Sequence, residues 1–501
     1  MKITLKTPVI LVRSLNENRG GITKASLTRA NMFAEKYNNV VIITTVFQRK
    51  HKQIINKLRK NGELADNVNV FNFFEDLRKT SKKKLFNKQK KHTIKEKGYV
   101  EFYVKDHPGK SYRYYKDGLY KMYKRFNKGQ IEFIDYMDNN GCRIKRAEFD
   151  ENGLLVRERF MDLKLNKPRF DKYYNYKGKC ILSVHVNPQT EEDGIAILFG
   201  KKPKQYNKLY TLQTEWLNNL LKKFENPVVF CEYRTLDDML INVKHPSIKK
   251  IAVTHSSHLK SPFNDITKVR PLYHKLFTDD KFDQYVFLTN SQKKDVEKVY
   301  KENKKFIVIP HTFDHNTINK NDIVRDKFLA VSIARYTEDK RLDEAINAFR
   351  IVVNQIPNAK YHIYGKGELK QYLQDLIDKL NLSENVILKD YTNNPGEVYK
   401  SAACSILTSR REAFGLVMIE SMAEGTPVVA YDFKYGPQDI ITDNVDGYIV
   451  ENGNREELAN KIIRIMTDDE LRERLSKNAL SIRDKFSKEI YKKKWISVLE
   501  E

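Results

Sequence analysis

The hydrophobic pattern at the start of the chain is that of a parallel α/β domain. An apolar run at 8–15 is followed by a turn at 18–21 and by helical spacing of apolar residues over 22–37. The continuous β-branched run at 40–46 is typical of a parallel strand that is buried on both faces. We therefore predict a βαβ unit here, with a further strand at 67–74.

The pattern changes between Tyr99 and Val186, where Tyr and Lys residues are dense. Turn dipeptides ending in glycine recur there at intervals of 11, 12 and 12 residues, at Gly118, Gly129, Gly141 and Gly153. Strands that alternate aromatic and charged residues between such turns indicate an antiparallel meander. We predict a β-rich insertion over residues 80–200.

Parallel-strand signals return after the insertion. Apolar runs at 227–232, 250–255, 284–289 and 306–313 predict four more strands. The polar stretch 314–326 is typical of a linker, and a second α/β run begins at Phe328. Its predicted strands lie at 328–335, 360–367, 385–391, 404–409 and 426–432, with helices over 455–485 and 487–500.

Two series of alternating strands and helices predict an α/β fold with two doubly wound, Rossmann-like domains facing a cleft. We assign residues 1–79 and 201–318 to the first domain, on the acceptor side, and residues 80–200 to the insertion. Residues 319–486 form the second domain, and the C-terminal helix at 487–501 is expected to pack back on the first. In such sheets a ligand lies outside the carboxyl ends of the strands.

The net charge of +26 is large enough to require a physical explanation. One interpretation is a lysine-rich solvated surface, and the other is a polyanionic partner attracted by the field of the protein. Residues 78–128 contain 18 Lys or Arg against 4 Asp or Glu, which favours a polyanion or an acidic membrane surface. Charge alone does not distinguish nucleic acid, acidic glycopolymer and lipid.

The chain contains no apolar run of the roughly 20 residues that a membrane-spanning helix requires. Its first apolar stretch is too short for a signal peptide. The four cysteines are scattered and show neither metal-type spacing nor a disulfide framework. We expect a cytoplasmic protein.

Cations follow the first predicted strand of the second domain. Arg335 stands at the strand exit, and Lys340 lies just ahead of a helix. Cations disfavour a helix N-terminus unless an anion binds there, so both are candidates for binding a phosphate. The alternative is a pair of surface cations. Gly20 and Gly21 follow the first strand of the chain and would let a backbone approach a diphosphate; the alternative, which this pair alone favours, is an ordinary turn.

Two acids separated by seven residues follow the strand predicted at 404–409. Glu412 falls on the predicted loop, and Glu420 falls on the helix, on an otherwise apolar face. A carboxylate on such a face needs hydrogen-bond donors, and sugar hydroxyls would supply them. The alternatives are a loop charge and a solvated helical Glu. Among the other strand exits, His255 is a candidate to bond a sugar or an acceptor, and His258 a weaker one.

These motifs resemble the retaining GT-B glycosyltransferases of family 4. That family's signature is a Glu, seven residues and a Glu, matched by Glu412 and Glu420 in EAFGLVMIE. Arg335 and Lys340 match its two cations, and Gly20-Gly21 match its glycine pair. The chain is also similar to the Gram-positive wall teichoic acid α-glycosyltransferases of the TagE/TarM type, which share the phrase YDxxYGPxDxI, here YDFKYGPQDII at 431–441.

The resemblance implies a UDP-sugar donor, UDP-N-acetylglucosamine or UDP-glucose, and neither a further cofactor nor a metal. Arg335, Lys340 and the glycine pair would neutralise the departing diphosphate. Glu412 would contact the donor hexose, and His255 would also act at the reacting centre. The nucleotide-binding positions would be Gly20, Gly21, Glu420, Gly365, Tyr391, Phe414, Gly415 and Leu416.

The resemblance also implies a polyanionic acceptor, namely poly-glycerol or poly-ribitol phosphate. The insertion would serve self-association, with a trimer favoured, and polymer binding near the inner face of the membrane. Two alternatives remain open. One is the same transfer to Ser-rich or Ser-Asp repeat adhesins, whose glycosyltransferases are close relatives. The other is a non-catalytic polyanion-binding module; nucleic acid is not expected, because its only support is the Tyr- and Lys-rich insert.

Overall fold

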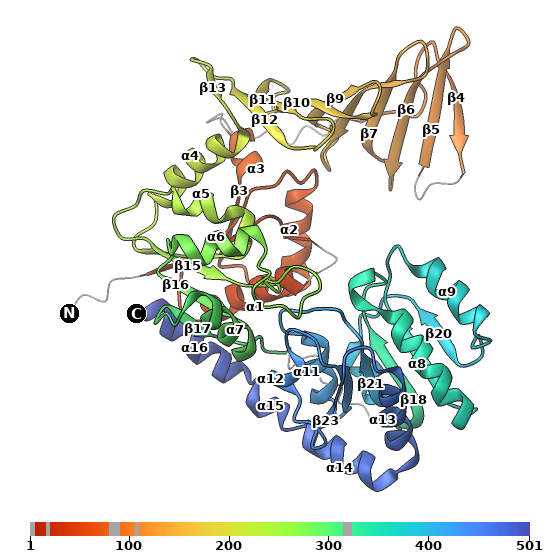
Figure 1. Ribbon diagram of the computed structural model, residues 1–501. Helices are drawn as coiled ribbons and strands as arrows, with labels where there is room; N and C mark the ends of the chain where they lie inside the picture. The colour runs from red at the N-terminus through yellow and green to blue at the C-terminus, as the bar shows by residue number, and fades with distance from the viewer. Residues whose placement is uncertain (1–5, 17–20, 80–90, 106–109, 314–322) are drawn as a thin grey trace. The chain divides into compact units, whose positions relative to one another are not determined.

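The computed structural model describes residues 6–16, 21–79, 91–105, 110–313 and 323–501. The chain forms two compact units, Met1–Lys250 and Ile251–Glu501. Three β-sheets organise the molecule (Figure 1).

The first sheet has seven strands in the order β17-β16-β15-β14-β1-β2-β3. Its pairs β14–β1, β1–β2, β2–β3, β15–β16 and β16–β17 are parallel. All residues of β1, β2 and β14 are buried, as their continuous apolar runs predict. The strands are β1 (Thr7–Val12), β2 (Val40–Thr44), β3 (Val68–Asn72), β14 (Pro227–Cys231), β15 (Lys249–Val253), β16 (Gln284–Phe287) and β17 (Phe306–Val308).

The second sheet is antiparallel and has ten strands in sequence order. Figure 1 shows it as a single twisted layer that extends away from α3 and α4, with β4 at its far end. The strands are β4 (Val100–Val104), β5 (Lys110–Lys116), β6 (Leu119–Asn127), β7 (Gln130–Met137), β8 (Arg143–Phe149), β9 (Leu155–Asp162), β10 (Lys167–Tyr174), β11 (Cys180–Val186), β12 (Asp193–Leu198) and β13 (Lys204–Tyr206). The helices of the first unit, Met1–Lys250, are α1 (Gly21–Ala34), α2 (His51–Lys60), α3 (Phe73–Arg78), α4 (Leu209–Leu221) and α5 (Asp237–Ile241), with a 3₁₀ turn at Arg234–Leu236.

Tight turns fix the register of this meander, as the glycine spacing predicts. Asp117-Gly118 join β5 to β6, and Lys128-Gly129 join β6 to β7. All four of these residues have positive φ, which is the requirement of a two-residue hairpin turn whose twist matches that of its strands.

A buried charge cluster attaches the ten-stranded sheet to α3. Arg78 lies between Glu75, at 3.0 Å, and Asp150, at 2.9 Å, and the Tyr176 hydroxyl donates to Glu75. Arg78, Glu75 and Asp150 are all more than nine-tenths buried. His51 of α2 is buried nearby, and burial lowers its pKa to about 4, partly opposed by the charge of Glu75. Since buried charges are tolerated only when paired, this cluster fixes the insertion to its domain.

The third sheet is parallel, with six strands in the order β20-β19-β18-β21-β22-β23. Its strands are β18 (Asp326–Ile333), β19 (Lys360–Tyr364), β20 (Val386–Lys389), β21 (Ala402–Leu407), β22 (Val428–Tyr431) and β23 (Gly447–Val450). The helices of the second unit are α6 (Pro271–Asp279), α7 (Asn290–Tyr300), α8 (Leu342–Gln355), α9 (Lys370–Lys379), α10 (Pro395–Lys400), α11 (Leu416–Ala423), α12 (Pro437–Ile440), α13 (Arg455–Thr467), α14 (Asp469–Ala479), α15 (Ile482–Lys485) and α16 (Lys488–Glu500), with a 3₁₀ turn, η3, at Glu338–Lys340.

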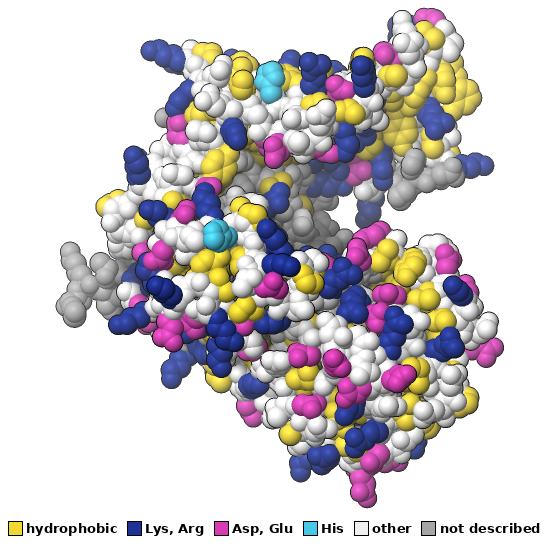
Figure 2. Space-filling model, viewed as in Figure 1, with side chains coloured by type: hydrophobic (Ala, Val, Ile, Leu, Met, Phe, Trp, Pro, Cys, Tyr) yellow, Lys and Arg dark blue, Asp and Glu magenta, His cyan; other side chains and the backbone are white. Residues whose placement is uncertain are grey.

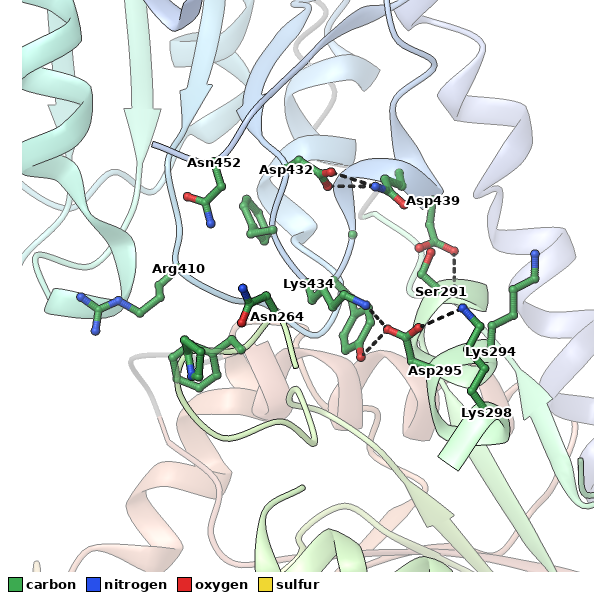
Figure 3. A pocket seen from close by; sticks show the side chains of 16 residues that line it. Asn264, Ser291, Lys294, Asp295, Lys298, Arg410, Asp432, Lys434, Asp439 and Asn452 are labelled. Atoms are coloured by element: carbon green, nitrogen blue, oxygen red, sulfur yellow. Dashed lines mark hydrogen bonds and ion pairs between the residues drawn. The ribbon is translucent and has the colours of Figure 1, made fainter. Parts of the chain in front are cut away.

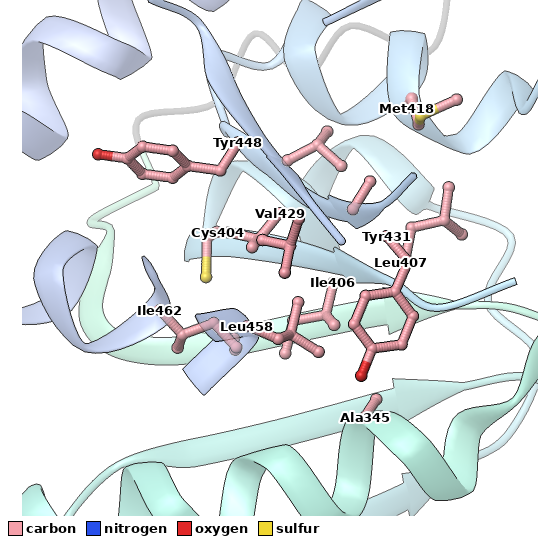
Figure 4. Close-up of a cluster of buried hydrophobic side chains, with 14 of the residues drawn as sticks. Ala345, Cys404, Ile406, Leu407, Met418, Val429, Tyr431, Tyr448, Leu458 and Ile462 are labelled. Carbon is pink, nitrogen blue, oxygen red and sulfur yellow. The ribbon is translucent and has the colours of Figure 1, made fainter. Parts of the chain in front are cut away.

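Helices cover both faces of the third sheet. α13 packs on β18, β21 and β22, and α10 and α11 contact β21. Figure 4 shows Leu458 and Ile462 of α13 against Ile406 and Val429 of the sheet, all of them buried. α16 hydrogen-bonds two strands of the first sheet, since Gln284 donates to Glu501 and Lys494 donates to the carbonyl of Val308.

Three elements differ from the sequence-based prediction. The strand predicted at 67–74 ends at Asn72, whose side chain accepts from the amides of Phe74 and Glu75 and so begins α3. The antiparallel sheet continues to Tyr206, past the expected end of the insertion at residue 200, and the pattern did not reveal β23. Most of the expected linker at 314–326 lies outside the described residues.

Candidate active site

The first feature of the site is the turn after β18, which carries Arg335. Two glycines of the turn after β19 pack against it: a Cβ on Gly365 would lie 1.9 Å from the carbonyl oxygen of Ala334, and one on Gly367 would lie 2.3 Å from that of Tyr336. The amide of Tyr336 also donates to the carbonyl of Lys366. Only glycine permits this backbone approach, so the glycines hold the Arg335 turn in place.

Arg335 itself is exposed, and within the described residues its side chain makes no hydrogen bond or ion pair. Lys340 ends η3, and the Thr408 hydroxyl at the exit of β21 donates to the carbonyls of Lys340 and Arg341. The turns after β18 and β21 are therefore tied together at one edge of the sheet.

Glu412 is held by two donors on the loop between β21 and α11. Lys340 Nζ pairs with its carboxylate, and Ser409 Oγ donates to the same oxygen at 2.9 Å. The side chains of Lys340 and Glu412 are 16% and 19% exposed, so the pair remains reachable by a ligand. The structure thus brings together two of the four residues that the sequence singled out for catalysis.

Glu420 lies on α11 and is half-buried. Burial raises the pKa of the Tyr399 hydroxyl, and the charge of Glu420 raises it further. Among the described residues the Tyr399 hydroxyl has no hydrogen-bond partner. Gly415 precedes α11 with φ +89°, and Leu416 is the first residue of the helix. The predicted loop-then-helix placement of Glu412 and Glu420 is therefore confirmed.

His255, at the exit of β15, reaches the Glu412 loop through a chain of rings. Its ring stacks on that of His311, with 5.6 Å between the ring centroids. The His311 ring makes an edge contact with the Phe414 ring, also with 5.6 Å between the centroids. The Phe414 ring is buried and also contacts Phe486. His311 was not singled out by the sequence.

The remaining predicted positions are more scattered. Tyr391 follows β20 and is 58% exposed, with Lys366 over its ring at 5.7 Å. Gly21 is the first residue of α1, and a Cβ there would meet no described atom within 4 Å. Gly20 lies outside the described residues.

A cavity of about 470 Å³ opens beside this loop (Figure 3). It is lined by charged and polar side chains of α7, of the segment 432–439 and of two loops. Lys434 and the hydroxyl of Tyr435 both bond Asp295 of α7 on its wall, and the Tyr435 distance is 3.0 Å. His258 stacks flat on Tyr435 at 5.8 Å. It is fully buried, and burial lowers its pKa to about 4, so it is a structural rather than a titrating histidine near neutrality.

Known proteins match the chain along its whole length. A model of glycosyl transferases group 1 matches residues 313–481, and one of glycosyl transferase 1 domain A matches residues 10–199. The poly(glycerol-phosphate) alpha-glucosyltransferase of Bacillus subtilis (strain 168) is 30% identical over 515 residues, covering 97% of this chain and 74% of that protein. The chain belongs to the group 1 glycosyltransferases.

Two further relatives support this membership. The poly(ribitol-phosphate) alpha-N-acetylglucosaminyltransferase of Staphylococcus aureus (strain COL) is 29% identical over 502 residues, which are 99% of each chain. A crystal structure of a mutant of S. aureus TarM in complex with Fondaparinux, alpha-GlcNAc-glycerol and UDP is 25% identical, with a TM-score of 0.85 over 99% of this chain and 100% of that one. The predicted GT-B class, with two parallel Rossmann-like sheets and an antiparallel insertion in the first domain, is confirmed.

The two family matches fall on different sheets of this group 1 glycosyltransferase. The domain A match begins within β1 and contains β2–β12, and the group 1 match contains the whole six-stranded sheet. Within the described ranges, no helix is long and apolar enough to span a bilayer, and no cluster of three His, Cys, Asp or Glu side chains is placed to bind a metal. Sequence reasoning missed Ser409, Asp295 and the roles of Lys434 and Tyr435, although the last two stand in the quoted phrase at 431–441.

Proposed function

We propose that this group 1 glycosyltransferase transfers glucose or N-acetylglucosamine from a UDP-sugar to poly(glycerol phosphate) or poly(ribitol phosphate), with retention at the anomeric carbon. The observation that carries the proposal is the Lys340–Glu412 pair at the carboxyl edge of the six-stranded sheet, beside the Arg335 turn. The activities named for the two relatives that match nearly the whole of this chain supply the substrates. Since nucleotide sugars are cytoplasmic, the reaction belongs there, with the polymer held near the inner face of the membrane.

Lys340 and Arg335 act on the leaving group. When the bond between C1 of the sugar and UDP breaks, negative charge develops on the β-phosphate. Preorganised cations stabilise this charge most strongly in the transition state, and removing one such donor typically lowers the rate by roughly 10²–10³. Lys340 is preorganised by its pairing with Glu412, whereas the Arg335 guanidinium is free to fold over the diphosphate.

The two glutamates orient the donor. Glu412 accepts from hydroxyls of the hexose, and its carboxylate offsets the positive charge that grows on the sugar ring. Glu420 binds the ribose hydroxyls. Gly21 leaves room for the diphosphate, because the space beside it contains no described atom within 4 Å of where a Cβ would lie.

No separate nucleophile is required for this chemistry. The acceptor hydroxyl oxygen bonds to C1 on the face that UDP leaves, and its proton passes to the departing β-phosphate oxygen. The ring of His311 lies between His255 and the Phe414 ring, and His255 orients the acceptor hydroxyl or the sugar by a hydrogen bond. The four charged side chains therefore have distinct tasks: Arg335 and Lys340 stabilise the leaving diphosphate, Glu412 orients the sugar that is transferred, and Glu420 holds the ribose of the donor.

Radiolabelled transfer tests the proposal directly. UDP-glucose and UDP-N-acetylglucosamine are each offered with purified poly(glycerol phosphate), with poly(ribitol phosphate) and with a Ser-Asp peptide. We expect label in one of the two polyol phosphate polymers and none in the peptide. Label in the peptide alone would assign the enzyme to adhesin repeats. Absence of label from all three acceptors would contradict the proposal.

The β-insertion is proposed to bind the polymer. Ion pairs neutralise much of β7–β10: Arg146 pairs with Asp135, Arg157 with Glu148, and Arg159 with Asp171. The cationic excess falls on β4–β6, where Lys110, Arg113 and Lys116 are exposed and form no ion pair with a described residue. A phosphodiester chain complements such a surface.

We also propose that the outer edge of the insertion joins three copies of the chain. β4 ends the sheet, and Val100, Phe102 and Tyr103 on it are 60%, 57% and 52% exposed. Figure 2 shows hydrophobic side chains gathered over this end of the sheet. An exposed apolar edge strand is a template for pairing with another chain, and such patches on soluble proteins mark interaction sites.

Light scattering after gel filtration tests the trimer. We expect a particle of three times the chain mass of 59.0 kDa, and Phe102→Asp should reduce it to the monomer. Ile195→Asp is the control, because Ile195 is 41% exposed on β12, near the other end of the same sheet. A monomeric wild type, or dissociation by Ile195→Asp alone, would contradict this assignment.

A further inference from the structure

The segment Tyr431–Ile441, which carries the phrase YDFKYGPQDII, does not belong to the group of residues assigned to the donor. In the structure it lies between the Glu412 loop and α7, and it contacts both. The role of this segment therefore depends on what it connects.

On one side the segment is bound to the Glu412 loop through its backbone. The amide of Tyr435 donates to the carbonyl of Glu412 at 2.9 Å, and the amide of Glu412 donates to the carbonyl of Lys434 at 3.3 Å. Gly436 adds a close approach, because a Cβ there would lie 2.0 Å from the carbonyl oxygen of Phe414, and its φ is +128°. The position of the Glu412 backbone therefore follows the position of residues 434–436.

On the other side the same segment is bound to α7. The ammonium of Lys434 and the hydroxyl of Tyr435 both bond one oxygen of Asp295 (Figure 3). Asp439 accepts from the amides of Asn290 and Ser291 at 2.8 and 3.2 Å and so caps the N-terminus of α7.

Asp295 is the centre of this connection. It is 6% exposed and faces three groups: Lys434, Tyr435 and Lys298, whose ammonium is 3.9 Å away. Tyr435 is 1% exposed and is held flat against the buried ring of His258. A buried carboxylate with these partners has one stable arrangement, so it fixes both side chains that it binds.

We propose that Asp295 is a positioning residue for glycosyl transfer, which holds Glu412 in its reactive place through Lys434 and Tyr435. The proposal rests on the role of Glu412 given above. A displacement of about 1 Å at a reacting group typically lowers the rate by roughly 10²-fold. Because Asp295 touches neither donor nor Lys340 in this account, its loss should affect turnover and leave donor binding nearly unchanged.

The first test is the isosteric substitution Asp295→Asn. It removes the charge that attracts Lys434 and keeps an acceptor for Tyr435. We expect kcat for polymer glycosylation to fall about 10-fold, and about 100-fold for Asp295→Ala, with KM for the UDP-sugar within about twofold of wild type. Asp432→Asn is the matched control, since Asp432 lines the same cavity but its carboxylate accepts only from Gln438 among the described side chains.

A double-mutant cycle separates positioning from a merely structural role. In the background of Glu412→Gln, Asp295→Asn should lower kcat by less than twofold, because the group that it positions is already lost. Independent effects would instead multiply in the double variant. Tyr435→Phe, which removes one of the two connections and leaves the aromatic packing on His258, should give a smaller loss with the same cycle behaviour.

Wild-type kcat in a folded Asp295→Ala variant, or multiplying effects in the cycle, would overturn the inference. If Asp295→Ala does not fold, the Tyr435→Phe cycle decides by the same criterion. If Glu412→Gln itself transfers sugar at the wild-type rate, the assignment of the active site fails, and this inference fails with it; a slow Glu412→Gln beside a fast Asp295→Ala overturns the inference alone.

Discussion

At the residue scale, the proposed site depends on the Lys340 ammonium, which has two interaction partners. Lys340 pairs with Glu412 in the structure and is proposed to meet the diphosphate of the donor. The pair is partly exposed, so solvent screens it, and its value lies in geometry rather than in stability. A charge fixed before the substrate arrives lowers a barrier more than one that must first reorganise.

This argument predicts the effect of Lys340→Ala. We expect kcat to fall by roughly 10²–10³, because one donor to the developing charge is lost, while the melting temperature stays within a few degrees of wild type. Steady-state kinetics and thermal unfolding measure the two quantities. Lys370→Ala is the control, since Lys370 begins α9 and forms an exposed ion pair with Asp390; a comparable loss in both variants would contradict the role of Lys340.

A second residue-scale prediction concerns Gly365. Gly365→Ala places a methyl group 1.9 Å from the carbonyl of Ala334, so the turn that carries Arg335 must move. We expect a loss of more than about 2 kcal/mol in unfolding free energy together with a raised KM for the UDP-sugar. Gly178→Ala separates the cost of positive φ from that of the clash, because Gly178 has φ +75° and open space around it; it should cost about 1 kcal/mol and leave KM unchanged. Equal effects in the two variants would contradict the account.

At the element scale, strand exits were predictable and the contacts between them were not. Apolar runs locate the ends of β18, β19 and β21, so Arg335, Gly365 and Glu412 could be placed at one edge of a sheet from the sequence. Ser409 and Asp295 could not be found in this way, because their roles depend on partners that only the folded chain brings close. β13 was not predicted, because its three residues Lys204–Tyr206 contain no apolar run, and the four residues of β23 were not predicted either.

The elements around α7 also predict an acid sensitivity. Burial lowers the pKa of His258, between Tyr435 and α6, to about 4, below its ordinary value of 6.5. A histidine kept neutral by the fold contributes stability that is present above pH 6.5 and is lost as the pH falls towards 4, because the unfolded chain binds the proton first. His51 of α2 behaves in the same way.

Replacing His258 tests this at one site. His258→Phe removes the titrating group from a position where neither ring nitrogen has a hydrogen-bond partner among the described residues. Between pH 6.5 and 4.5 this variant should lose about 2 kcal/mol less unfolding free energy than wild type. Denaturant titrations at both pH values measure the difference, and identical pH profiles would show that His258 has the same pKa in the folded and the unfolded chain.

At the scale of the whole molecule, the net charge of +26 is unevenly distributed along the chain. Ion pairs neutralise the β7–β10 part of the insertion, whereas β4–β6 keep their excess. A long-range field of this kind attracts a polyphosphate chain and has little bearing on a donor held by a few short contacts.

Salt dependence distinguishes these two kinds of binding. Raising the salt concentration from 0.05 to about 0.5 M should weaken binding of poly(glycerol phosphate) at least tenfold more than binding of UDP, since screening acts on spread surface charge. Calorimetry with each ligand measures both affinities. Arg113→Ala combined with Lys116→Ala should reduce the salt response of the polymer alone, and equal salt responses for polymer and UDP in the wild type would refute recruitment by charge.

The central claim is that Glu412, held by Lys340 and Ser409 at the carboxyl edge of the six-stranded sheet, acts on the sugar as UDP leaves. The most direct measurement is the rate of UDP release from a UDP-sugar in the presence of poly(glycerol phosphate) or poly(ribitol phosphate), for wild type and Glu412→Ala, with the affinity for UDP measured alongside. The account predicts a loss of at least about 100-fold in the rate with an affinity for UDP within a few-fold of wild type. A Glu412→Ala enzyme that releases UDP at the wild-type rate would contradict it.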